Sequence, residues 1–180
     1  MGADRSMWPG VVAGGRCGEC GWKVHDLEDG DLVRLMGGEG PAWAGVLRGA
    51  SVEVLRWRPA PEVWTGLEYA AHVRGVLEVF GARVALMLRE DDPELVVWDD
   101  EAAVIEEAYD EQDPAEVLAG IQAAAAAYAE VLRGVVGSAW SRTGRREDTV
   151  FTVSSISWYG LHESVHHRHD VERALQNAPT

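Results

Sequence analysis

Hydrophobic residues recur every three or four positions along most of this chain, a spacing typical of amphipathic helices. Four long segments carry the pattern, and we expect helices over residues 30–48, 65–90, 113–137 and 152–176. The chain has no series of short segments in which polar and apolar residues alternate, the pattern that predicts a sheet. The pattern therefore favours an all-α protein.

Residues with helix-capping roles mark where three of these helices begin. Thr65 opens a capping-box sequence, and Thr152 stands in the corresponding place before the last helix. Asp113 is followed by Pro114, a combination that favours the first turn of a helix. The second helix should stop before Pro93, because proline disfavours helical backbone in the residue that precedes it.

The segments between these helices are mostly expected to be loops. A short helix is predicted over 99–109, inside a long connection between the second and third helices, and residues 37–41 should weaken or kink the first helix. A brief strand over 51–56 stays open as an alternative, while 58–61 and 144–148 are expected loops. Four long helices with one long connection predict a four-helix bundle.

The composition fits one globular domain with an acidic surface. The 180 residues are 47% hydrophobic and 26% charged, and 16 basic against 30 acidic side chains give a net charge of −14. This charge disfavours nucleic acid and anionic membrane surfaces as partners, because both are polyanions. We expect residues 30–180 to form the bundle and residues 1–29 to form an N-terminal segment of the same domain.

We expect neither a secretory signal nor a membrane-spanning segment in this chain. Its first residues lack the basic region and unbroken apolar stretch of a secretory signal, and no apolar run approaches the ~20 residues that cross a bilayer. Cys17 and Cys20 are its two cysteines, too few for a disulfide framework. We therefore expect a cytoplasmic protein in a reducing compartment.

Imidazole and carboxylate side chains fall on the inner faces of two predicted helices. At 100° per residue, His167 lies within the apolar stripe of the last helix, with Glu163 and Asp170 along its edge. His72 lies in the apolar stripe of the second helix. Polar groups buried without partners are costly. One interpretation is a buried Glu163–His167 ion pair with His72 packed nearby.

The other interpretation is a divalent metal bound by His72, Glu163 and His167. Glu163 and His167 are four residues apart, so both side chains reach one point beside the helix. A ligand from a neighbouring helix completes a set of two histidines and one carboxylate, which leaves coordination positions open for water or a substrate. We expect zinc in this site, with nickel as the alternative.

Cys17 and Cys20, in the sequence CGECG, form a second candidate metal site. A CxxC pair followed by glycine is half of a tetrahedral zinc site and needs two further ligands. His162 and His166, four residues apart on the outer face of the last helix, are predicted to supply them. The resulting Cys₂His₂ site is closed and therefore structural. His25 is an alternative ligand, and two reduced, unliganded cysteines are the remaining alternative.

The segments EYAAHVRGV and LHESVHHRHDV resemble the DinB/YfiT-like superfamily. The resemblance implies a four-helix bundle whose divalent metal is held by a histidine on the second helix and a pair four apart on the last, here His72, Glu163 and His167. In the mycothiol-dependent maleylpyruvate isomerase branch the pair is Glu-x-x-x-His followed by Arg-x-Asp, which Arg168 and Asp170 complete. Further segments, among them CGECGW and EDDPEL, resemble an actinobacterial DinB-like subgroup.

The resemblance implies a metal-dependent S-transferase or isomerase that uses a low-molecular-weight thiol, with mycothiol as the expected co-substrate. Asp170 is expected to assist catalysis by orienting a ligand, and Arg83, three turns after His72, meets an anionic group or forms a plain salt bridge. A metal-assisted hydrolase with Asp170 as base and a non-catalytic metal-binding module are the alternatives. Trp158 and Val165, on the outer side of the last helix, either cover the N-terminal segment or form a homodimer interface.

Overall fold

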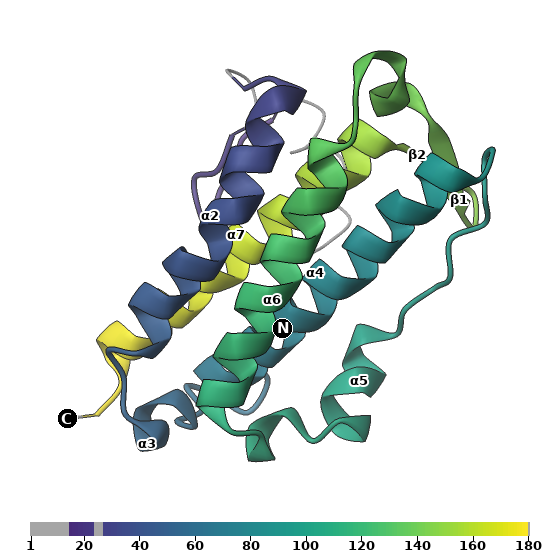
Figure 1. Cartoon of the computed structure of the whole chain (residues 1–180). Coiled ribbons are helices and arrows are strands. Elements are labelled where there is room, and N and C mark those ends of the chain that lie inside the picture. Colours follow the sequence, from purple (N-terminus) through teal and green to yellow (C-terminus); the bar gives the residue numbers. More distant parts are fainter. Residues whose placement is uncertain (1–14, 24–26, 180) are drawn as a thin grey trace.

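The computed structural model describes residues 15–23 and 27–179 (Figure 1). The long helices in this part of the chain are α2 (Asp29–Leu47), α4 (Gly66–Arg89), α6 (Pro114–Arg133) and α7 (Val153–Asn177). They confirm the predicted all-α four-helix bundle. Three of them begin and end next to the predicted residues, whereas α6 ends well before residue 137.

Each helix of the bundle packs against two others. α2 contacts α6 and α7, and α4 also contacts α6 and α7. Apolar side chains from all four helices fill the space between them, among them the fully buried Trp43 and Tyr128. α4 and α6 run in the same direction and α7 runs opposite to them (Figure 1). The helices that carry the first set of predicted ligands, α4 and α7, are therefore antiparallel neighbours.

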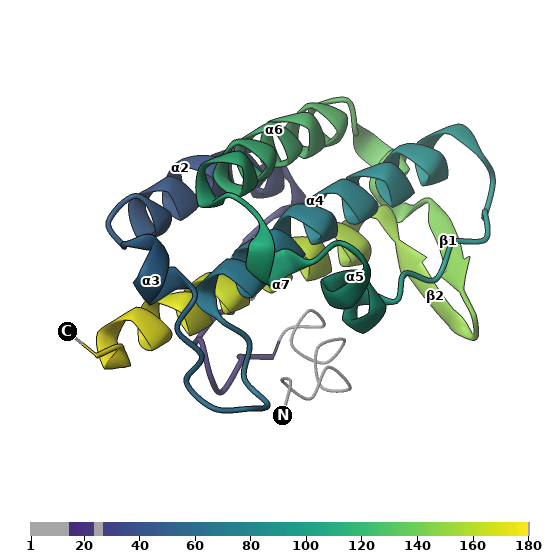
Figure 2. The ribbon, with the colours of Figure 1, turned by 90° about the horizontal axis from the view of Figure 1, so that it is seen from below.

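The long connection returns the chain from the end of α4 to the other end of the bundle, where α6 begins (Figures 1 and 2). It contains the helix α5 (Asp100–Glu106) and the 3-10 turn η2 (Tyr109–Glu111). The short helix predicted over 99–109 is thus present in its first part. Ala108, in the left-handed region with a φ of 46°, separates it from η2.

The prediction that residues 144–148 form a loop is wrong. β1 (Thr143–Arg146) and β2 (Thr149–Thr152) pair as an antiparallel hairpin that leads into α7. β1 is polar and each strand is only four residues long, so the sequence carries no extended alternating pattern. Backbone contacts help to hold the hairpin in place. The N–H of Leu95 donates to the carbonyl of Arg145 at 2.6 Å.

The strand left open for residues 51–56 is a helical turn instead. α3 (Val52–Leu55) begins after Ser51, whose hydroxyl accepts a hydrogen bond from the N–H of Val54. This cap satisfies one of the N–H groups that the first turn leaves without a helical partner. A 3-10 segment, η3 (Gly137–Ser141), precedes the hairpin.

The glycine-rich part of α2 serves close helix packing. α2 remains one continuous helix through Pro41. A Cβ added at Gly40 would lie 3.2 Å from Cα of Gln122 on α6. The absence of a side chain at Gly40 therefore lets α2 and α6 approach each other.

α6 corrects the expectation that no segment is long and apolar enough to cross a membrane. By length and composition it passes that test, with a mean hydropathy of 1.3. Alanines supply much of this hydropathy, and 44% of the tested window is buried inside the bundle. Because α6 packs between α2 and α4, its apolar character is that of a core helix.

Candidate metal centres

α7 carries two pairs of candidate ligands with the same spacing. Glu163 and His167 are four residues apart, and so are His162 and His166. The pairs are offset by one residue, about 100° around the helix, so they point to different sides. The first pair meets α4, the second meets the N-terminal segment, and all four side chains are at most 3% exposed.

The first cluster joins Glu163 and His167 to His72 of α4. Oε2 of Glu163 lies 3.4 Å from Nε2 of His167 and 3.8 Å from Nε2 of His72. Ligand atoms about 2.1 Å from a shared tetrahedral metal lie roughly 3.4 Å from one another. The three donor atoms all lie within 4.8 Å of each other, so their positions and their chemistry fit a divalent cation.

The electrostatics of this cluster favour an ionised carboxylate. Burial acts to raise the pKa of Glu163, but hydrogen bonding and positive charge from His167 and His72 outweigh it and hold that pKa well below its usual range. Burial acts to lower the pKa of His167, but Asp170 and Glu163 outweigh it and raise that pKa. A metal requires the ionised form of Glu163, which the surroundings already stabilise.

Aromatic rings enclose the cluster. Trp98 stacks on His72 with ring centroids 5.5 Å apart, and Tyr69 stacks on His167 at 5.1 Å. Trp64 lies 5.1 Å from the ring of His72. These rings restrict the rotation of both imidazoles and exclude water around them, which strengthens electrostatic interactions at the cluster.

Asp170 contacts histidines of both clusters. Its Oδ2 lies 3.1 Å from Nδ1 of His167 and 3.6 Å from Nε2 of His166. It thus touches the nitrogen of His167 that faces away from Glu163. Such a position is typical of a carboxylate that orients a metal ligand.

The second cluster contains all four residues of the predicted Cys₂His₂ site. Sγ of Cys17 lies 3.4 Å from Nδ1 of His166, and Sγ of Cys20 lies 3.6 Å from Nε2 of His162. The four donor atoms lie within 4.8 Å of one another. Burial raises the pKa of Cys20 to about 11 and lowers that of His162 to about 4. The alternative ligand, His25, lies outside the described residues.

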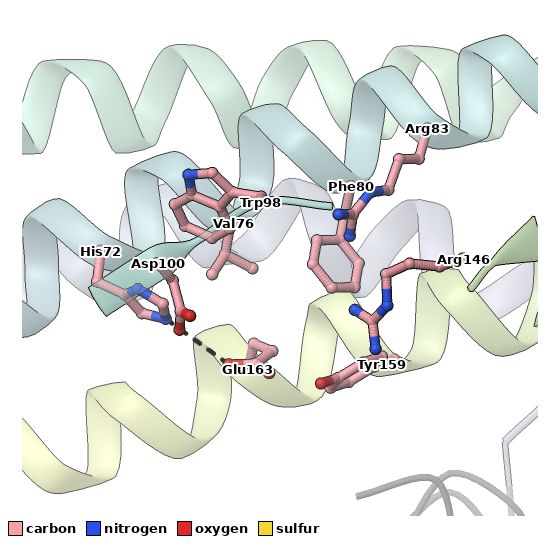
Figure 3. A pocket seen from close by; sticks show the side chains of 9 residues that line it. All are labelled: His72, Val76, Phe80, Arg83, Trp98, Asp100, Arg146, Tyr159 and Glu163. Atoms are coloured by element: carbon pink, nitrogen blue, oxygen red, sulfur yellow. Dashed lines mark ion pairs between the residues drawn. The ribbon is translucent and has the colours of Figure 1, made fainter. Parts of the chain in front are cut away.

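A pocket that is partly open to solvent extends from the first cluster along α4 (Figure 3). His72 and Glu163 line one end, and Phe80 lies between them and the guanidinium groups of Arg83 and Arg146 (Figure 3). Within residues 15–23 and 27–179, no carboxylate forms an ion pair with either arginine.

Arg83 stays cationic in this setting. Its Nη2 donates to the carbonyl of Val96 at 2.7 Å, and its guanidinium lies 5.1 Å from the centre of the Phe80 ring. Burial, followed by repulsion from Arg146, lowers the pKa of Arg83 to about 10. At neutral pH the pocket therefore presents positive charge opposite the candidate metal ligands.

Among the residues that line the pocket, Asp100, Arg146 and Tyr159 carry polar groups that were not predicted as part of a site. Tyr159 lies one turn before Glu163 on the same face of α7, so the helical spacing contained the signal that identifies it. Asp100 and Arg146 come from α5 and β1, and their approach to the site depends on how the long connection and the hairpin fold back.

Two comparisons with known proteins identify the family and the fold of this chain. A family model described as the DinB superfamily matches residues 41–171. The chain belongs to the DinB superfamily. The resemblance of its sequence to that superfamily is thereby confirmed, while membership of the actinobacterial subgroup stays a prediction. No curated protein matches the chain.

The DinB fold also appears in a solved structure similar to this one. That structure is YfiT from Bacillus subtilis, described as "a probable metal-dependent hydrolase with an unusual four-helix bundle topology". The TM-score is 0.74 at 16% identity, and the likeness covers 83% of this chain and 89% of that one. At this identity the likeness shows a shared fold.

The DinB match covers all of the first cluster but only the two histidines of the second. It includes His72, Glu163 and His167 together with His162 and His166. Residues 17 and 20 precede the matched range. The second cluster therefore combines two histidines of the DinB region with two cysteines from outside it.

Proposed function

We propose that the protein is a metal-dependent enzyme that acts on a small anionic substrate with a low-molecular-weight thiol as co-substrate. One observation carries the proposal. His72 and Glu163, two of the three clustered ligands, line one end of a pocket whose other end holds Arg83 and Arg146. A ligand set that faces a pocket is typical of a catalytic metal site, whereas a structural site is closed by protein ligands.

His72, Glu163 and His167 hold the cation in this proposal, with zinc as the expected metal and nickel as the alternative. A bound divalent cation with open coordination positions supplies Lewis acidity that lowers the pKa of a thiol or of water. Asp170 accepts a hydrogen bond from Nδ1–H of His167 and so leaves the lone pair of Nε2 available to the cation that Glu163 would also bind.

The substrate side of the pocket favours an anion. Guanidinium groups bind carboxylates and phosphates through charge-assisted hydrogen bonds, and Arg83 and Arg146 both face this space (Figure 3). In a chain with a net charge of −14, two such cations at one pocket are a specific feature. Phe80 lies against Arg83 and keeps the space between the two ends apolar.

The resemblance to thiol-dependent DinB proteins supports a thiol as the nucleophile, with mycothiol as the expected one. In a transferase reaction the thiolate sulfur bonds to an electrophilic carbon of the substrate, and the leaving group departs with its electron pair. In an isomerase reaction the thiol adds to the substrate and is eliminated again unchanged.

Hydrolysis is the second candidate, and Asp100 is the observation that favours it. Its carboxyl group lines the pocket on the same side as His72 (Figure 3). A carboxylate at that place accepts a proton from an attacking water. Asp170, which does not line this pocket, is less well placed for that role. The description of YfiT as a probable hydrolase supports the same reaction class.

The test uses the full-length chain loaded with zinc or nickel and a panel of carboxylate-bearing electrophiles. We expect thiol consumption that requires the metal, is abolished in His167→Ala and persists in His169→Ala, a matched control on the same helix. Product formed without any thiol would instead establish the hydrolase. Full activity in His167→Ala, or tight metal binding with no turnover on the panel, would contradict the enzyme and favour a non-catalytic module.

A further inference from the structure

We propose that Cys17, Cys20, His162 and His166 bind a zinc ion in a closed tetrahedral site that fastens residues 15–23 to α7. This site is separate from the metal centre of the proposed function and does not depend on it. It uses no residue of the His72 cluster, although both clusters draw ligands from one helix.

The distances between sulfur and nitrogen atoms match a shared zinc ion. With Zn–S bonds of about 2.3 Å and Zn–N bonds of about 2.0–2.1 Å, tetrahedral geometry places S and N about 3.5 Å apart. The two distances in the structure are 3.4 Å, from Cys17 to His166, and 3.6 Å, from Cys20 to His162. Separate S–H···N hydrogen bonds would explain each pair, but not the approach of all four donor atoms to within 4.8 Å.

The donor set is the one that zinc prefers in closed sites. Two thiolates and two imidazoles form a common structural zinc site, and thiolates disfavour magnesium and calcium. His162 and His166 are almost completely buried, and Cys17 is 6% exposed. Four protein ligands complete the tetrahedron and leave no position for a substrate.

The carboxylates near His166 act as its outer partners rather than as a competing site. Nδ1 of His166 faces Cys17, while its Nε2 lies 3.2 Å from Glu19 and 3.6 Å from Asp170. A histidine bound to zinc through one nitrogen donates the proton of the other to a carboxylate or a carbonyl. Glu19, His166 and Asp170 offer one nitrogen and two carboxylates, one of them exposed, which makes them a weaker zinc set.

The backbone around the cysteines is folded to present both sulfurs to α7. The N–H of Cys17 donates to the carbonyl of Trp22 at 2.9 Å, and the N–H of Gly21 donates to the carbonyl of Cys17 at 3.1 Å. Gly21 adopts a φ of +74°, a conformation that favours glycine. The resulting tight turn lies beside α7 (Figure 2).

A zinc ion explains how this segment is held. Residues 15–23 contain no helix, and their own secondary structure is one bridge between Arg16 and Lys23. Trp22 packs against the bundle core, but a single partly buried ring leaves most of the segment at the surface. Structural zinc supplies folding free energy in short segments of this kind.

Cobalt substitution tests the site directly. The full-length reduced chain is stripped of metal and titrated with Co²⁺, because cobalt bound to thiolate absorbs in the near ultraviolet through sulfur-to-metal charge transfer. The His72 cluster contains no sulfur and cannot give this band. We expect the band to be complete when both sites are filled, at two cobalt ions per chain in wild type and at one in His72→Ala, and to disappear when zinc displaces the cobalt. Absence of the band in reduced wild-type protein would overturn the proposal without any variant.

Matched variants separate the two sites. Cys17→Ser and His162→Ala should each lose the charge-transfer band and one equivalent of zinc, while His72→Ala should keep the band and lose the other equivalent. Zinc should slow tryptic cleavage after Lys23 in wild type and in His72→Ala, but not in Cys17→Ser. Retention of both zinc ions in Cys17→Ser, with helical circular dichroism intact, would contradict the site. Loss of activity in His72→Ala bears only on the proposed enzyme.

Discussion

Asp170 accepts a hydrogen bond from His167, with Oδ2 lying 3.1 Å from Nδ1. The bond selects the tautomer of His167 whose Nε2 carries the lone pair, and Nε2 is the atom 3.4 Å from Glu163. Asp170 thus positions a ligand of the first cluster without lining the pocket itself.

Replacing that carboxylate should weaken metal binding. We expect Asp170→Asn to lower the affinity of the His72 cluster for zinc by roughly 10- to 100-fold, because the amide orients His167 less firmly and leaves its imidazole less basic. Competition with a chromogenic chelator measures the change in a Cys17→Ser background, which lacks the second zinc site that Asp170 also contacts. Glu172→Gln, one turn from Arg168 on the same helix, is the control. An unchanged affinity in Asp170→Asn would show that His167 needs no positioning residue.

The two neighbouring arginines of β1 should differ in their effect on substrate binding. Arg146 lines the pocket, whereas Arg145 is exposed and pairs with Asp92 at 2.7 Å. We expect Arg146→Gln to raise KM for an anionic substrate by about tenfold, since a hydrogen bond to a charged group contributes about 1.5–3 kcal/mol before solvent screening. Arg145→Gln should leave KM unchanged. Equal KM values in both variants would remove Arg146 from the binding site.

A buried carboxylate between α2 and α7 should make stability depend on pH. Burial raises the pKa of Glu39, although Ser164 donates to it at 2.7 Å and Arg168 lies 3.7 Å away. The folded protein therefore holds this proton more tightly than the unfolded chain, so its free energy of unfolding falls as pH rises from the ordinary pKa of glutamate to the raised value.

Glu39→Gln should remove that part of the pH dependence. The free energy of unfolding of the variant minus that of wild type should increase as the pH rises through this window and should stay constant above it. Urea unfolding of metal-free protein across the pH series measures the difference, with Glu78→Gln on the exposed face of α4 as the control. A difference that does not vary with pH would show that Glu39 keeps its ordinary pKa in the folded protein.

The hairpin should depend on the small size of Gly144. A Cβ at this position would lie 2.9 Å from Cγ of Met87 and 3.3 Å from Cδ2 of Leu95. We expect Gly144→Val to lower the free energy of unfolding by about 1–3 kcal/mol, because the added atoms overpack this contact. Gly45→Ala, in α2 with open space around its Cα, should raise it by about 0.5–1 kcal/mol. Thermal unfolding compares the two variants. An unchanged free energy of unfolding in Gly144→Val would show that Met87 and Leu95 move to accommodate the added atoms.

Helix caps and helical phase were readable from the chain because they are local. Thr65 and Thr152 each accept a hydrogen bond from the backbone N–H three residues later, as their positions in the sequence predict. His162 and His166 are four residues apart, so helical geometry places both side chains on one face, whatever the helix packs against. Both features depend on residues within one turn of each other.

The hairpin and the far end of the pocket were not readable in the same way. Arg146 and Asp100 reach the pocket because β1 and α5 fold back along α4, and no periodic pattern in their own segments records this. β1 is held partly by backbone hydrogen bonds such as that from Leu95 to Arg145, which do not require an alternating pattern of side chains. Contacts of this kind leave little trace in the amino-acid sequence.

By itself, the sequence determined the four helices, their inner faces and the two candidate ligand pairs on the last helix, because these properties repeat with the turn of an α-helix. Only the tertiary structure decided that His72 lies 3.8 Å from Glu163, that Cys17 meets His166, and that two arginines face the pocket. Those relationships join residues far apart in the chain. They are set by how the helices, the N-terminal segment and the connections pack together, which local periodicity does not encode.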